Sequence, residues 1–329
     1  MKTREELKRA PDELRRRCRG AMIGIAIGDS FGDASRKPEN QLAYGITTDF
    51  QKGASWSTDD TEFAMLTAKT LIDCGGRLTD ADVVKAWLEN VATQDEFKRG
   101  GASEFEASRN LRRGLRPPLS GQYNSYCHSD GAAMRIAPIG VYNAGDIDGA
   151  IAMAETDAHI SHYADGVWGA QSVAAAVACA MADGDIDEIL AAALKPIPES
   201  TWYRAAMLKA FEIVDSAKGC FFDAWMPLHD ELWCSYKAAV PEAVAQAFGV
   251  LKLEHGDFRT GMIAAGNFGR DADTIGAIVG SILGAKYGVD AIPPSWVEKP
   301  RYPTGTCLLF AKGIDILQVA DKLCDLILR

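Results

Sequence analysis

The chain has 329 residues, enough for one large domain or two small ones, and 47% of them are apolar, so a sizeable core can be buried. Its formal net charge is −10. This acidic balance argues against general binding to nucleic acid, because contacts with phosphate groups need clustered Lys and Arg side chains. The dense basic run at residues 15–19 is expected to form a solvated face of an amphipathic helix.

Three features of the sequence bear on the compartment. The N-terminal segment is charged and lacks the apolar stretch of a signal peptide. None of the eight cysteines forms a C-x-x-C pair, which disfavours zinc-ribbon and thioredoxin sites and fits reduced core thiols. No apolar window reaches the length of about 18 residues that a membrane span needs. We therefore expect a cytoplasmic protein with no membrane or nucleic-acid partner.

The hydrophobic pattern predicts a mostly helical chain, because Ala and Leu are abundant and signals for strands are rare. The segment 166–183 is apolar on nearly all sides, which predicts a buried central helix, whereas 116–131 is rich in Gly, Pro and Ser and is predicted to be a loop. In chain order, the expected helices cover residues 6–24, 61–74, 79–94, 166–183, 185–196, 201–217, 239–253, 257–268, 273–288 and 313–328. Since no low-complexity linker interrupts them, we expect a single compact all-α domain over residues 1–329.

The segment WSTDDTEFAML places two adjacent carboxylates, Asp59 and Asp60, between hydroxyl side chains at the start of a predicted helix. One interpretation is helix capping, in which Ser57 or Thr58 accepts a backbone N–H and the acids favour the positive helix terminus. The other is a site for a hard cation, because Mg²⁺ and Mn²⁺ prefer oxygen ligands. This segment alone leaves both interpretations open.

A second cluster of the same kind, Asp271, Asp273 and Thr274, precedes another apolar helix near the other end of the chain. If the two helix starts meet, their carboxylates surround one point and repel one another. A pair of divalent cations would neutralise them, and such pairs lie roughly 3.5–4 Å apart and activate a bridging water. The two clusters together favour a metal site.

Glycines recur at every fourth position in two segments, which predicts helices that approach a neighbour closely. Residues 28–32 also match G-x-S-x-G, the nucleophile elbow of α/β-hydrolases, with Ser30 as its serine. The poor helix signal after it and the lack of alternating strands and helices disfavour that interpretation. The glycines of the two segments are Gly20, Gly24, Gly28 and Gly32, and Gly276, Gly280 and Gly284.

Taken together, several motifs resemble those of the ADP-ribosylglycohydrolase family, which includes ADP-ribosyl-acceptor hydrolases and dinitrogenase-reductase-activating glycohydrolases. They run in the family's order from about Arg19 to Gly288, and the ordered set is far more specific than any one motif. The matching stretches are GAMIGIAIGDSFG, STDDTEFAM, DGAAMRIAPIG, AHISHYADGVWGAQSVAAAVA and GRDADTIGAIVGSILGA.

This resemblance implies an all-helical fold with a centre of two Mg²⁺ or Mn²⁺ ions and hydrolysis of an N- or O-glycosidic bond at C1″ of ADP-ribose. A carboxylate would relay the proton of an activated water, and both Asp59 and Asp60 are candidates for that catalytic role. The implied partner is an ADP-ribosylated protein or an ADP-ribose-type small molecule. By position in the motifs, the implied metal ligands are Thr58, Asp59, Asp60, Asp271, Asp273 and Thr274.

The resemblance also places the nucleotide along NSYCHSDGAAM, where glycines let backbone N–H groups approach a diphosphate. An alternative for His162 is a hydrogen-bonded structural histidine, and an alternative for Arg135 is a buried ion pair. The candidate substrate-binding residues are Ser125, Tyr126, Asp130, Gly131, Met134 and His162.

Two positions depart from the family pattern. Arg36 stands where many members have a glutamate that reaches the metals, and Glu39 is a candidate replacement if the loop differs. Asp130 stands where the family often has asparagine, which adds negative charge near a diphosphate. These departures favour one alternative to an ADP-ribosyl hydrolase, an enzyme for another ribosyl or nucleoside-type N-glycoside. A further alternative is a non-catalytic binding or structural protein, against which the presence of all six implied metal ligands counts.

Overall fold

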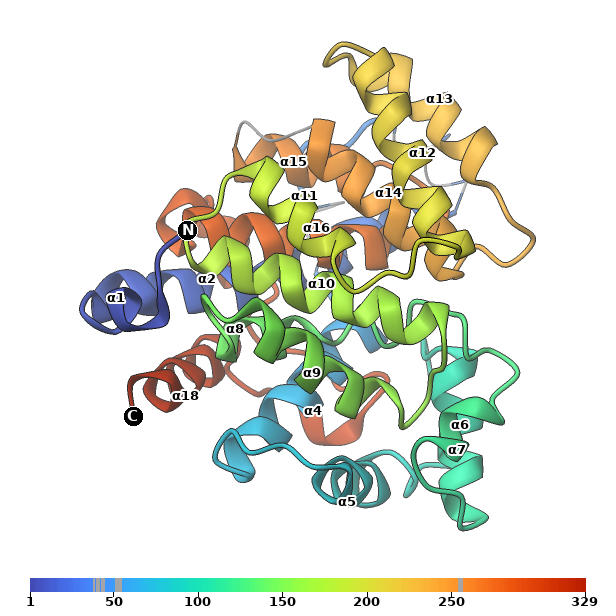
Figure 1. Ribbon diagram of the computed structural model, residues 1–329, viewed down its shortest axis with the longest axis vertical. Helices are drawn as coiled ribbons and strands as arrows, with labels where there is room; N and C mark the ends of the chain where they lie inside the picture. The colour runs from blue at the N-terminus through green and yellow to red at the C-terminus, as the bar shows by residue number, and fades with distance from the viewer. Residues whose placement is uncertain (38, 40–41, 43–44, 51–54, 254–256) are drawn as a thin grey trace.

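The computed structural model describes residues 1–37, 39, 42, 45–50, 55–253 and 257–329 (Figure 1). Within these residues the secondary structure is helical, and backbone pairing of the β type is limited to one isolated bridge between Ser129 and Ala239. The predicted all-α class is therefore confirmed. The α-helices are α1 (Arg4–Lys8), α2 (Pro11–Ser35), α4 (Asp59–Asp73), α5 (Asp80–Asn90), α6 (Ala102–Arg112), α7 (Leu119–Gln122), α8 (Ala137–Tyr142), α9 (Ile147–Ala158), α10 (Asp165–Met181), α11 (Ile186–Leu194), α12 (Trp202–Ser216), α13 (Phe221–Leu232), α14 (Val240–Leu253), α15 (Phe258–Gly266), α16 (Ala272–Tyr287), α17 (Pro294–Glu298) and α18 (Ile316–Leu328).

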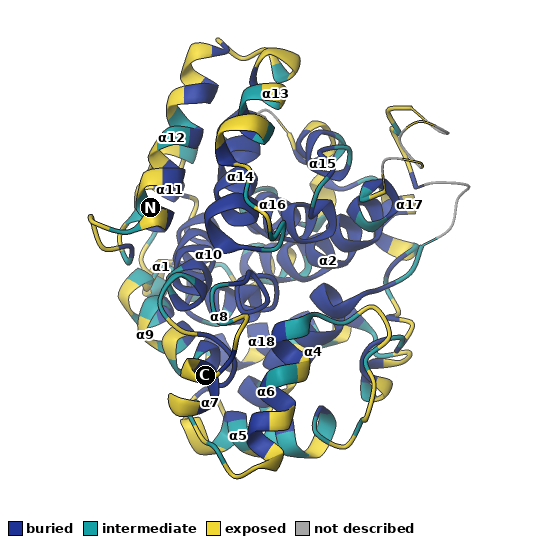
Figure 2. Ribbon diagram, turned by 90° about the vertical axis from the view of Figure 1, so that its right-hand side faces the viewer, coloured by how far each residue is buried: buried dark blue, intermediate teal, exposed yellow. Residues whose placement is uncertain are grey.

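The helices are arranged around a buried middle layer. Along the long axis, α12 and α13 lie at one end and α5, α6 and α7 at the other, while α10 crosses the centre (Figure 1). Figure 2 shows that α2, α10 and α16 are almost wholly buried, with exposed residues gathered on the outer helices. The prediction of a buried central helix at 166–183 is confirmed by α10. Other helices cover α10, which is where a helix that is apolar on nearly all sides is stable.

The closest pairing in the fold is between α2 and α16, which run antiparallel with their glycines facing one another. Gly20 faces Gly284, Gly24 faces Gly280 and Gly28 faces Gly276, each at backbone contact, and Gly32 faces Ala272. A side chain at any of these positions would collide with the partner's backbone. This pairing sets the N-terminal end of α16 beside the C-terminal end of α2, which brings Asp271 and Asp273 to the region of Asp29, Asp33 and Arg36.

Several sequence-based expectations were wrong in detail. The helix expected over 6–24 is two helices, because Pro11 at the first turn of α2 starts a new helix, and α2 then continues to Ser35. Glycine normally weakens a helix interior, but packing against α16 offsets that cost here. Among the described residues, six α-helices lie outside the predicted ranges: α6, α7, α8, α9, α13 and α17. The short helix α7 lies within 116–131, so the prediction of a loop there was wrong at Leu119–Gln122.

Ser30 lies inside α2 rather than on a strand-to-helix turn, it is 1% exposed, and its hydroxyl accepts the N–H of Trp56. The nucleophile-elbow interpretation is therefore wrong. The basic run at 15–19 also differs from expectation, because Arg17 is buried and donates to the C-terminal carbonyls of Ala180 and Lys286. Its neighbours in the run form ion pairs with aspartates.

The eight cysteines are unpaired in the structure, and the expectation of core thiols holds for the four that are buried, Cys18, Cys179, Cys307 and Cys324. Cys18 and Cys324 lie in the main hydrophobic core. Among the described residues, the helices are too short or too polar to cross a membrane.

Candidate metal centre

Two helix N-termini converge on one point, as the sequence clusters suggested. Thr58 is the N-cap residue of α4 and Asp271 that of α16, but neither side chain accepts a capping hydrogen bond from its own helix. The hydroxyl of Thr58 instead donates to Asp29, with Oγ1 and Oδ1 2.7 Å apart. Capping therefore does not account for these two side chains.

Three carboxylates meet where the helices converge. Asp59 and Asp60 from α4 and Asp273 from α16 each offer an oxygen, and these oxygens lie within 4.8 Å of one another. The three side chains are buried, and Oδ1 of Asp60 and Oδ1 of Asp273 have no hydrogen-bond partner. Buried polar atoms are normally paired, so two unpartnered carboxylate oxygens in one such group call for a ligand. We refer to Asp59, Asp60 and Asp273 as the acidic cluster.

The electrostatics of the acidic cluster point the same way. Burial raises the pKa of Asp59 well above its usual value, and the charge of Glu104 is the second cause. Burial also raises the pKa of Asp60 well above its usual value, and there the charge of Asp273 is the second cause. Burial also raises the pKa of Asp273 to about 8, although Arg36 opposes the shift. A divalent cation would relieve the repulsion between these groups and favour their ionised forms.

Asp29 was not singled out from the sequence, although it lies in the quoted GDSFG segment. It is fully buried on α2 and accepts hydrogen bonds from the N–H groups of Thr58 and Thr61 and from both their hydroxyls. Asp29 therefore holds the first turn of α4 in place and orients Thr58 toward the acidic cluster. The sequence signal that could have identified Asp29 was a carboxylate inside a glycine-rich helix.

Glu62, although part of the acidic stretch, does not face the acidic cluster. It accepts the N–H groups of Thr306, Cys307 and Leu308 at 2.9, 2.9 and 2.6 Å, and the hydroxyl of Ser57 at 2.5 Å. Glu62 thus anchors the segment before α18 to the start of α4. The crowding of acids in WSTDDTE therefore has two causes, a candidate ion site and a structural anchor.

Two cations of the chain lie at the other side of the cluster. The guanidinium of Arg36 contacts both Asp273 and Asp271, with Nη2 2.8 Å from Oδ1 of Asp271. Lys237 Nζ lies 3.0 Å from the same oxygen. Burial alone would lower the pKa of Arg36, but the carboxylates of Asp273 and Asp271 raise it above its usual range. Thr274, the remaining predicted ligand, is buried next to Asp273.

The predicted nucleotide-binding segment reaches the cluster only in part. Asp130 is buried, and burial followed by the charge of Asp271 raises its pKa well above the usual value. A methyl group on Gly131 would collide with Glu104, a buried glutamate that was missed from the sequence and whose Oε1 has no hydrogen-bond partner. Tyr126 is 38% exposed, and its ring packs 5.5 Å from that of Tyr236.

Three other predicted residues lie away from the acidic cluster. Ser125 hydrogen-bonds to Glu106, and Glu39 is exposed beside residues outside the described part of the chain. Met134 packs in a hydrophobic cluster with Phe63 and Trp87.

His162 is fully buried, with Nε2 2.8 Å from Ser129 Oγ and Nδ1 2.7 Å from Ser161 Oγ. Arg135 is also fully buried and pairs with Asp157 at 2.8 Å. His162 is therefore a hydrogen-bonded buried histidine and Arg135 is part of a buried ion pair, as the structural alternatives for these two residues predicted.

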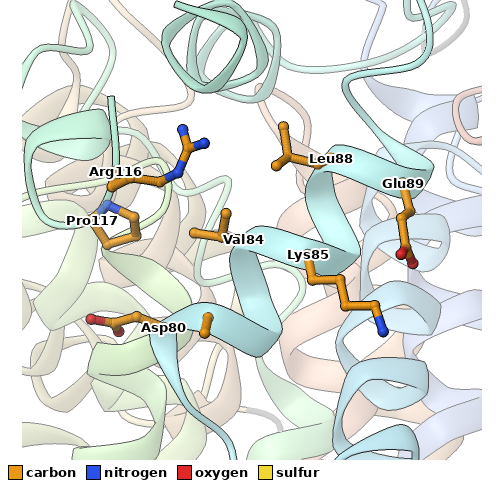
Figure 3. Close-up of a pocket in the computed structure, with 8 residues that line it drawn as sticks. Asp80, Val84, Lys85, Leu88, Glu89, Arg116 and Pro117 are labelled. Atoms are coloured by element: carbon orange, nitrogen blue, oxygen red, sulfur yellow. The ribbon is translucent and has the colours of Figure 1, made fainter. Parts of the chain in front are cut away.

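A separate hollow of about 520 Å³ lies along α5 (Figure 3). No residue of the acidic cluster lines it, so it is not part of this site. Its lining includes Asp80, Val84, Lys85, Leu88, Glu89, Arg116 and Pro117.

Comparison with known proteins identifies the family of the chain. Residues 10–328 match the family described as ADP-ribosylglycohydrolase. The chain is 27% identical over 302 residues to the ADP-ribosylarginine hydrolase Tri1 of Pseudomonas putida (strain GB-1), covering 88% of this chain and 75% of that protein. It is 24% identical over 301 residues to the ADP-ribosyl-[dinitrogen reductase] glycohydrolase of Rhodospirillum rubrum, covering 86% and 90%.

A solved structure described as an ADP-ribosylglycohydrolase-related protein complex has the same fold. Its TM-score is 0.64 at 21% identity, covering 96% of this chain and 97% of that one. The match of nearly the whole sequence, together with this fold, agrees with the ordered motifs. The chain therefore belongs to the ADP-ribosylglycohydrolase family.

Proposed function

We propose that this protein is a metal-dependent hydrolase that cleaves the C1″ glycosidic bond of an ADP-ribosylated protein or a related ADP-ribose compound. The observation that carries the proposal is the convergence of Asp59, Asp60 and Asp273 with two buried, unpartnered oxygens. Membership of a glycohydrolase family supports the reaction class. The printed names of the two relatives favour an ADP-ribosyl group as substrate, and one of them names an arginine linkage.

The residues fit a divalent cation, because the ligand group found among the described residues consists of the carboxylates of Asp59, Asp60 and Asp273, with threonine hydroxyls next to them in the chain. Asp60 and Asp273 would hold the cation through their unpartnered oxygens, with the hydroxyls of Thr58 and Thr274 beside them. When bound, Mg²⁺ or Mn²⁺ would polarise a substrate oxygen and lower the pKa of a bound water.

The remaining chemistry would fall to the chain's own side chains. Asp59 is 8% exposed whereas Asp60 is 1% exposed, so Asp59 is the better placed of the two to accept a proton from an attacking water. Glu104 lies near Asp59, since a methyl group on Gly101 would contact both carboxylates. Tyr126 and Tyr236 present aromatic rings close to Asp130 and would give a flat ring of the substrate a surface to stack on.

The test is release of ADP-ribose from arginine-linked and serine-linked ADP-ribosyl proteins with Mg²⁺, with Mn²⁺ and with EDTA. Wild-type protein should release ADP-ribose only when metal is present, and Asp273→Ala should not. Asp325→Ala removes an exposed aspartate of α18 and is the matched control, which should keep wild-type activity. Release that is unaffected by EDTA or by Asp273→Ala would refute the proposal.

A second candidate is hydrolysis of another ribosyl or nucleoside-type N-glycoside at the same centre. Two observations favour it: the guanidinium of Arg36 within the site, and the buried carboxyl of Asp130 where a diphosphate was expected. Metal-dependent cleavage of nucleoside-type compounds without release from either protein linkage would favour this candidate.

A further inference from the structure

The two sides of the acidic cluster differ in charge. On one side, Asp60 Oδ1 and Asp273 Oδ1 are buried and have no hydrogen-bond partner. On the other side, Asp271 is already compensated, because Arg36 Nη2 and Lys237 Nζ lie 2.8 and 3.0 Å from its Oδ1. The chain's own cations therefore compensate the carboxylate on the second side, whereas the two oxygens on the first side receive no hydrogen bond.

Arg36 is held in this position by the fold. It is the C-cap residue of α2, and its N–H donates to the carbonyl of Gly32, where α2 contacts Ala272 at the start of α16. Its guanidinium spans Asp271 and Asp273, and Nη1 lies 3.6 Å from Asp33. A planar guanidinium with several donors suits the bridging of two carboxylates, and it stays charged at any ordinary pH.

A divalent ion bound between Asp271 and Asp273 would compete with this guanidinium for the same oxygens. The paired ions of two-metal sites lie roughly 3.5–4 Å apart, which is the scale of the cluster itself. The guanidinium and a second ion would then carry like charges at close range in a buried site, where repulsion is strong. Displacing Arg36 would also break its contacts with both aspartates.

We infer that Arg36 takes the place of a second divalent cation, so that this centre binds one divalent ion, at Asp60 and Asp273 with Asp59 beside them, next to a permanent guanidinium. This inference depends on the part of the proposed function that places a metal ion in the site. It does not depend on which reaction the site catalyses. It changes the expectation of two ions that the family resemblance implies. It also makes Arg36 a positioning residue, which holds Asp273 so that its free oxygen faces the ion.

The test is a count of bound Mn²⁺, made by titration calorimetry and by elemental analysis after gel filtration, without any substrate. Wild-type protein should bind one Mn²⁺ per chain, with the electron paramagnetic resonance spectrum of an isolated ion. Arg36→Gln, which removes the charge, should admit a second Mn²⁺ and give the spectrum of a coupled pair. Arg99→Gln is the matched control, because Arg99 pairs with Asp33 at the same end of α2 but forms no ion pair with Asp271 or Asp273 in the described part of the chain.

Two bound ions in wild-type protein, with the spectrum of a coupled pair, would overturn the inference whatever the variant does. Wild-type protein that binds no Mn²⁺ would overturn both the inference and the metal requirement of the proposed function. One bound ion without release of ADP-ribose would leave the inference standing and refute only the proposed activity. The wild-type count decides the matter even if Arg36→Gln fails to fold.

Discussion

Substitution of Gly24 by alanine tests whether the glycine contact between α2 and α16 positions the site. A methyl group on Gly24 would lie 2.6 Å from the carbonyl carbon of Gly280, whereas real Cβ atoms essentially never approach within 3.0 Å. The obstacle is backbone, so the helices must separate. Overpacking costs about 1–3 kcal/mol, and we expect the upper end against fixed backbone. The better helix propensity of alanine returns about 1 kcal/mol, which leaves a net loss of about 2 kcal/mol.

The assay is urea denaturation of the metal-free protein, followed by titration with Mn²⁺. Separation of the helices moves Asp273 away from Asp59 and Asp60, so Gly24→Ala should lose both stability and affinity for the ion. Gly249→Ala is the matched control, because a methyl group there meets only side-chain atoms, the nearest at 3.1 Å on Leu228. It should be neutral or stabilising by up to about 1 kcal/mol. The reasoning is wrong if Gly24→Ala is as stable as Gly249→Ala.

Three further outcomes are expected. Asp60→Asn should weaken Mn²⁺ binding by more than the 10- to 100-fold that losing an outer-shell partner typically costs, with no fall in the melting temperature of the metal-free protein; unchanged affinity in calorimetry would contradict this. Glu62→Gln should lower the free energy of unfolding by about 3 kcal/mol in urea denaturation, because the amide NH₂ group of glutamine would face backbone N–H groups that now donate to the Glu62 carboxylate. A variant as stable as wild type would contradict the anchoring role of Glu62. His162 has a pKa well below 6.5, first because of burial and then because of Arg135, so its unfolded form binds a proton that the folded form refuses. The contribution of the neutral His162 to stability is therefore present above pH 6.5 and lost as the pH falls below it. Below pH 6.5 the free energy of unfolding of the wild-type protein should fall by about 1.4 kcal/mol per pH unit more than that of His162→Gln. Parallel curves of stability against pH for the two proteins would disprove this.

Much of the fold follows from local sequence patterns. The long apolar helices α10 and α16 were predicted because their composition and spacing are visible in a short window. The extension of α2 to Ser35 was not predicted, since helix propensity disfavours the glycines that packing later stabilises. The break at Pro11 was not predicted either. The helix α6 was missed for another reason: polar and charged residues make up most of it, so its stability comes from tertiary packing more than from a local apolar pattern.

The sequence by itself determined the all-α class, the family and the two acidic helix starts that carry Asp59, Asp60 and Asp273, because residue type and spacing along one chain suffice for these. Only the tertiary structure decided which acids share a site. It assigned Glu62 to the anchoring of a distant segment, gave Asp29 to the first turn of α4, and set Arg36 against Asp271. The physical reason is that charge compensation depends on distances between residues far apart in the chain, and packing of helices fixes those distances.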